Sequence, residues 1–139
     1  MQTEIRNRCN AVEECYEFML AYAAQGLPSD AGSKSGGQIR EFLGRAVTAL
    51  EGLSETCTLA VKEGGLKSPE KYAAFFATLD RDVSDSLAAI DLVLAQPTIS
   101  SQLIDNLNAS IHLRALLTDL FLISDILCGV NHTAQKTVG

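Results

Sequence analysis

The segment from Ser100 to Cys128 constrains the fold most, because it is long, apolar and interrupted by a regular line of polar residues. If the segment forms one helix, its apolar side chains fall on two faces and the polar line runs between them. The polar line consists of Asp105, Asn108, His112 and Asp119. These residues are three, four and seven positions apart, so they lie along one side of a helix. A helix with two apolar faces needs two partners, which is typical of a bundle that also dimerises.

Three further segments have the spacing of amphipathic helices, with apolar residues at every third or fourth position. Glycine and proline separate these segments, and the loop of residues 26–37 is expected to be mobile. The four helices are expected at about residues 3–25, 38–63, 69–95 and 99–128. We therefore predict an all-α fold, an antiparallel up-down four-helix bundle that forms a single domain of residues 1–129. A frayed tail of residues 130–139 should follow.

The composition excludes several classes of partner. The net charge of −6 is spread along the chain without a basic stripe, so nucleic acid is not an expected partner. No signal core precedes the first helix and no run reaches about 18 apolar residues, so no membrane association is expected. No C-x-x-C pair occurs among the four cysteines, which are expected as buried thiols in the cytoplasm: Cys9, Cys15, Cys57 and Cys128.

The first helix carries a series that matches the polar line in spacing. Arg8, Cys15 and Tyr22 are seven residues apart, as are Asp105, His112 and Asp119. If the first and fourth helices were antiparallel neighbours, three layers would form: Arg8 with Asp119, Cys15 with His112, and Tyr22 with Asp105. An arginine beside an aspartate suits a partly buried seam, because the guanidinium can bond a carboxylate through two nitrogens.

The polar line has two interpretations. It either forms a seam that sets the register between helices, or it lines a pocket for a small molecule or metal in which His112 is a ligand or carries a proton. The chain has no H-x-x-x-H or E-x-x-H motif, so no metal site is predicted. The acidic cluster Asp80, Asp82 and Asp85 is expected on a solvated helix face.

No set of residues in the sequence points to catalysis, and none identifies a cofactor. The predicted function is therefore that of a non-catalytic helical bundle, which acts by protein–protein interaction in a regulatory or adaptor role. Self-association as a homodimer through the fourth helix is expected, with another protein as a further possible partner. The alternative is a bundle that binds a small molecule or metal along the polar line.

Overall fold

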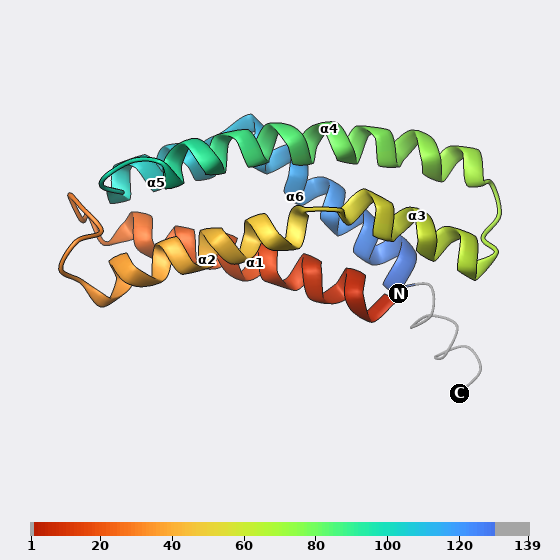
Figure 1. Cartoon of the computed structure of the whole chain (residues 1–139), viewed down its shortest axis with the longest axis horizontal. Coiled ribbons are helices and arrows are strands. Elements are labelled where there is room, and N and C mark those ends of the chain that lie inside the picture. Colours follow the sequence, from red (N-terminus) through yellow and green to blue (C-terminus); the bar gives the residue numbers. More distant parts are fainter. Residues whose placement is uncertain (1, 130–139) are drawn as a thin grey trace.

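The computed structural model describes residues 2–129, and these residues form helices and loops without a β-strand (Figure 1). The predicted all-α class is confirmed. Residues 2–129 contain six α-helices and a final π-helical turn: α1 (Gln2–Ala24), α2 (Lys34–Leu50), α3 (Leu53–Gly64), α4 (Pro69–Leu94), α5 (Ser101–Ala109), α6 (Ile111–Ile123) and η1 (Ser124–Cys128). The predicted tail of residues 130–139 lies outside the described residues.

The second predicted helix, residues 38–63, starts earlier and is broken in two. It begins at Lys34, because the Ser33 side chain caps it by accepting a hydrogen bond from the Gly36 amide at 2.9 Å. The break falls at Gly52, whose φ of 74° lies in the left-handed region that glycine adopts without steric cost. The apolar face expected along this segment is therefore divided between α2 and α3.

The fourth predicted helix, residues 99–128, is also broken. Ser110 has extended backbone dihedrals (φ −64°, ψ 144°), so it ends α5 and begins α6. Its hydroxyl accepts a hydrogen bond from the Leu113 amide at 3.3 Å and caps α6. After this break, α6 crosses from behind α4 toward the N-terminal end of α1 (Figure 1).

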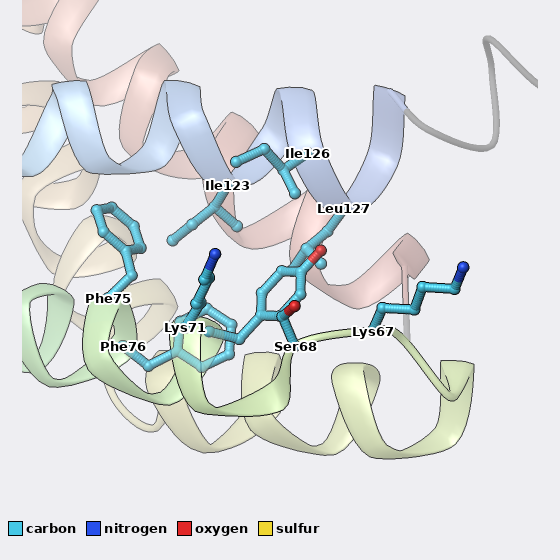
Figure 2. Close-up of a pocket in the computed structure, with 9 residues that line it drawn as sticks. Lys67, Ser68, Lys71, Phe75, Phe76, Ile123, Ile126 and Leu127 are labelled. Carbon is cyan, nitrogen blue, oxygen red and sulfur yellow. The ribbon is translucent and has the colours of Figure 1, made fainter.

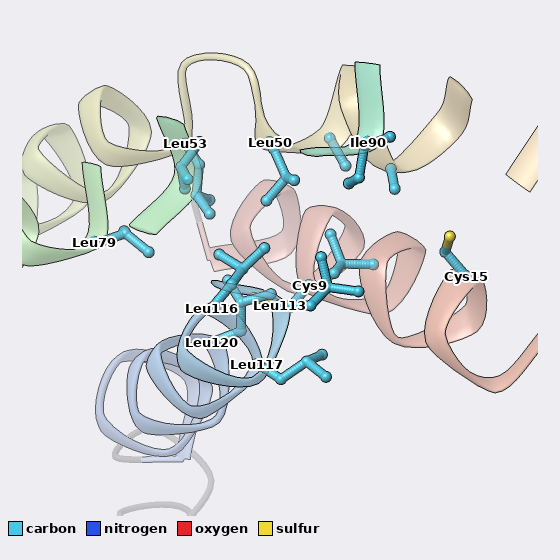
Figure 3. Close-up of a cluster of buried hydrophobic side chains, with 14 of the residues drawn as sticks. Cys9, Cys15, Leu50, Leu53, Leu79, Ile90, Leu113, Leu116, Leu117 and Leu120 are labelled. Atoms are coloured by element: carbon cyan, nitrogen blue, oxygen red, sulfur yellow. The ribbon is translucent and has the colours of Figure 1, made fainter. Parts of the chain in front are cut away.

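The core forms where α6 meets the other helices. In Figure 3 the side chains of Leu113, Leu116 and Leu120 point toward Cys9 of α1 and toward Leu50 at the end of α2. Leu116 and Leu120 are fully buried. Helix α1 packs against α2 and α5, whereas α6 packs mainly against α4. The direction of α6 therefore decides which polar residues can meet inside the molecule.

The loop between α1 and α2 is tied to the chain that follows α4. Asp30 accepts hydrogen bonds from the Arg40 guanidinium at 2.6 Å and from the Ile99 amide at 2.7 Å. Arg40 also donates to the carbonyls of Leu94 and Gln96 at the end of α4. The loop is expected to be mobile from its sequence, but Asp30 at its centre forms a charged anchor to Arg40 and to Ile99.

A second anchor joins Leu27 of the same loop to Ser101 at the start of α5. The Ser101 amide donates to the Leu27 carbonyl, and the Leu27 amide donates to the Ser101 hydroxyl, both at 2.8 Å. The Tyr22 hydroxyl donates to the Ile99 carbonyl at 2.6 Å in the interior. Together these bonds hold the start of α5 against the end of α1.

Candidate functional site

The polar line does not form one site, because the break at Ser110 divides it between two helices. Asp105 and Asn108 lie on α5, whereas His112 and Asp119 lie on α6. Asp105 and His112 are exposed, Asn108 is half-buried and Asp119 is buried. The Asn108 Oδ1 atom is buried without a hydrogen-bond partner among the described residues. The four side chains therefore do not line a common pocket.

The three predicted layers between the first helix and the polar line are also absent from residues 2–129, and this prediction is wrong. Arg8 donates to the carbonyls of Ala49 and Glu51 at 2.9 and 2.6 Å, where it binds the end of α2 instead of Asp119. Tyr22 bonds the Ile99 carbonyl and not Asp105.

Cys15 is buried in the core, whereas His112 is exposed, so the two side chains do not form a pair. Burial raises the pKa of Cys15 to about 12. Burial likewise raises the pKa of Cys9 to about 11 and that of Cys57 to about 12. These thiols are protonated at neutral pH and are poor nucleophiles.

Asp119 meets a different partner, Asp82 of α4. Burial raises the pKa of Asp119 to about 7, and the neighbouring Asp82 carboxyl adds to this effect through a hydrogen bond and through its charge. The Asp119 Oδ2 atom is buried and has no hydrogen-bond donor among residues 2–129. The ionised carboxylates of Asp82 and Asp119 could not bond one another, because both would be acceptors. A proton held between the two carboxyls supplies the missing donor, since a protonated carboxylic acid can donate to a carboxylate.

The position of Asp82 corrects the expectation that its acidic cluster lies on a solvated face. Asp80 and Asp85 are exposed, but Asp82 is half-buried against α6. One turn further along α4, the Ser86 hydroxyl donates to the His112 carbonyl at 3.1 Å. The contact between α4 and α6 thus carries two polar interactions that the sequence pattern did not indicate.

The outer face of α6 and η1 is an exposed apolar stripe. Ile111 is 76% exposed, Leu122 45% and Ile126 42%, with Ala115 half-buried between them. Phe121, which is 52% exposed, lies beside this stripe. We define the outer stripe as Ile111, Ala115, Leu122 and Ile126. It is the second apolar face that the sequence predicted for this segment, and no other helix of residues 2–129 covers it fully.

A groove of about 540 Å³ between the end of α1 and the start of α5 is lined by Asp105 of the polar line. Two further grooves lie elsewhere on the described helices. One, of about 410 Å³, lies between the start of α4 and the end of α6 with η1 (Figure 2). The other, of about 900 Å³, runs between α1 and α2 and has charged walls that include Arg8, Glu41 and Arg45. Neither groove is lined by Asp82, Asp119 or His112.

Within residues 2–129, no three side chains of His, Cys, Asp or Glu lie close enough together to hold a metal ion. The same part of the chain has no helix with the length and apolar character needed to cross a membrane. Comparison of the chain with protein-family models, with curated proteins and with solved structures finds no match. The fold of residues 2–129 defines the class of this chain as an all-helical protein.

Proposed function

We propose that this protein is a non-catalytic interaction protein that associates with a second copy of itself through the outer stripe. The observation that carries the proposal is the exposure of Ile111, Leu122 and Ile126 on one side of α6 and η1. Large apolar side chains gathered on one helix face are typical of an interaction surface, whereas single exposed ones are ordinary.

The stripe is complementary to itself when two copies pack antiparallel. Ile111 and Ile126 lie equally far from the middle of the segment, and so do Ala115 and Leu122. A two-fold axis near Thr118 would therefore set Ile111 against the second copy's Ile126, and Ala115 against the second copy's Leu122. Each large side chain meets either a similar one or a small one, which suits close helix packing.

The charges beside the stripe agree with the same arrangement. Arg114 and Asp125 are exposed on its outer edge, on opposite sides of the middle of the segment. Neither takes part in an ion pair within the described part of the chain. In the antiparallel pair Arg114 of one copy comes near Asp125 of the other, so that two equivalent ion pairs flank the apolar contact.

The test is the oligomeric state of the purified protein, measured by size-exclusion chromatography with light scattering. We expect a dimer at micromolar concentrations and a monomer for Leu122→Lys, because a buried lysine without a partner is costly. Leu92→Lys is the matched control, since Leu92 is 66% exposed on α4 and lies outside the stripe. A monomeric wild-type protein, or a dimer that Leu122→Lys leaves intact, would contradict the proposal.

Charge reversal tests the antiparallel geometry itself. Arg114→Glu and Asp125→Arg should each weaken the dimer, because each sets like charges against one another. The two substitutions together restore opposite charges and should return most of the affinity. If the losses of dimer affinity in the two single variants simply add in the double variant, the pairing of Arg114 with Asp125 is ruled out.

The proposal includes a regulatory or adaptor role in the cytoplasm, which the four buried thiols support. We also propose that α2 with α3, and α5 with α6, are bent segments of an up-down four-helix bundle. Ligand or metal binding along the polar line is the weaker alternative, since its exposed members lie on different helices.

A further inference from the structure

The groove at the start of α4 has the walls of a site for a hydrocarbon chain. Five apolar side chains from α4, α6 and η1 line it: Phe75, Phe76, Ile123, Ile126 and Leu127. In Figure 2 the side chains of Phe75 and Ile123 face one another across the space between the helices. Its volume of about 410 Å³ lies within the range of about 300–1,000 Å³ that small-molecule sites occupy.

The polar side chains that line the groove are those of Lys67, Ser68, Lys71 and Tyr72, and the two lysines define its charged rim. Lys67 and Lys71 both line it, and neither forms an ion pair within residues 2–129. Figure 2 shows the Lys71 side chain reaching from α4 toward Ile123, with Lys67 at one end of the groove. Glu70, the acidic residue of the same turn, does not line the groove. The rim therefore has a local positive charge on a chain with a net charge of −6.

The start of α4 adds to this positive charge. Ser68 occupies the capping position with a left-handed φ of 60°, and its side chain makes no capping hydrogen bond. The hydroxyl of Ser68 lines the groove and remains available to a ligand. The first turn of a helix carries a partial positive charge, which favours an anion at this end.

We infer that this groove binds a free single-chain amphiphile with an anionic head group. The hydrocarbon chain lies along the apolar walls of the groove. The head group meets the Lys71 ammonium, and Lys67 adds positive charge at one end of the groove. A cationic head group would be repelled by the same lysines. The net negative charge of the protein opposes attraction to an anionic bilayer surface, which favours an amphiphile taken from solution.

This site does not depend on self-association. Ile126 belongs both to the groove and to the outer stripe, but the other walls of the groove lie outside the stripe. Binding should therefore be measurable in the Leu122→Lys variant, whatever the oligomeric state of the wild-type protein. Failure of one proposal leaves the other to be judged by its own measurement.

The test is isothermal titration with three ten-carbon probes below their micellar concentrations: decanoate, decanol and decyltrimethylammonium. We expect decanoate to bind one molecule per chain, at least about tenfold more tightly than decyltrimethylammonium. Decanol should bind with intermediate affinity, because it keeps the tail without the charge. Equal affinity for the anionic and cationic probes, or no binding of decanoate, would overturn the inference.

Variants separate the head-group contact from the apolar walls. Lys67→Ala combined with Lys71→Ala should weaken decanoate binding by about fivefold and leave decanol unchanged, since two exposed charges each contribute modestly. Lys34→Ala combined with Lys62→Ala is the control, because it removes two exposed lysines that do not line the groove. If both double variants lower decanoate affinity equally, the rim lysines do not select the ligand.

Discussion

Asp119 on α6 and Asp82 on α4 bring two carboxyl groups together at a contact between helices, with Asp119 only 6% exposed. Two ionised carboxylates at such a contact would repel one another, and burial disfavours the charged form further. The pKa of Asp119 is accordingly raised to about 7. The packing of α6 on α4 is therefore linked to the binding of one proton.

This linkage predicts how stability depends on pH. In the unfolded chain Asp119 should titrate near pH 3.9, whereas in the folded protein it holds its proton up to about pH 7. The folded state therefore binds more protons between these values, and the free energy of unfolding should fall as pH rises from about 4 to 7. Urea unfolding at pH 5 and at pH 8 measures this difference directly.

Asp119→Asn should remove this dependence, because the amide cannot ionise. Its free energy of unfolding should exceed that of the wild-type protein at pH 8, with a smaller difference at pH 5. Asp105→Asn is the control, since it removes an exposed carboxylate of α5. An equal change of the pH profile in both variants would contradict the assignment to Asp119.

The anchor of the first loop should show the opposite dependence on pH. The hydrogen bond from Arg40 is the largest cause of a lowered pKa at Asp30, followed by the bond from the Ile99 amide. The ionised Asp30 therefore stabilises the fold above about pH 4, and this contribution is lost as pH falls through the lowered value. Asp30→Asn should cost about 1–3 kcal/mol at pH 6 and much less at pH 2.5, measured by urea unfolding.

Gly36 and Gly37 are neighbours in α2 and should respond in opposite directions to alanine. A Cβ atom at Gly36 would overlap the backbone carbonyl of Asp30, whereas one at Gly37 would meet nothing within 4 Å. We expect Gly36→Ala to lose about 2–4 kcal/mol by overpacking. Gly37→Ala should gain about 0.5–1 kcal/mol, because alanine favours the helix. Thermal unfolding of both variants checks the prediction, and equal effects would refute it.

The cap at Ser110 should be needed for α6 to begin where it does. Ser110→Ala removes the side chain that accepts a bond from the Leu113 amide and should cost about 1 kcal/mol. Ser84→Ala, at an exposed position within α4, should be neutral or slightly stabilising. Chemical denaturation distinguishes the two variants, and similar values for both would show that the cap contributes little.

Much of the fold could be predicted because helix periodicity is a local property. The apolar spacing of the first helix predicts an inner face of six residues. Ile5, Cys9, Val12 and Met19 are buried there, whereas Tyr16 and Ala23 are half-buried. The breaks at Gly52 and Ser110 were missed, since a glycine or serine inside a periodic segment is also compatible with a continuous helix. Gly36 and Gly37 favour a loop in the sequence, but Ser33 caps the helix before them, so α2 begins earlier than predicted.

The candidate site was less predictable because it depends on the direction of helices after a break. The layers of Arg8, Cys15 and Tyr22 assumed a straight fourth helix beside the first. The turn at Ser110 instead brings α6 against α4, where Asp119 meets Asp82. Exposure of the second apolar face followed from periodicity alone, whereas the groove beside it required the position of α4.

The π-helical turn at Ser124–Cys128 determines how the two ends of the described chain meet. The Gly129 amide bonds the Ser124 carbonyl five residues back, so this turn holds about one residue more than an α-helical turn. The Leu127 carbonyl accepts a hydrogen bond from the Gln2 side chain at 2.7 Å, and Leu127 and Cys128 are buried. If the same residues formed a regular α-helix instead, the residues after the extra one would be rotated about the helix axis by up to about 100°. The turn thus acts as a length adjustment that keeps the last helix in phase with the first.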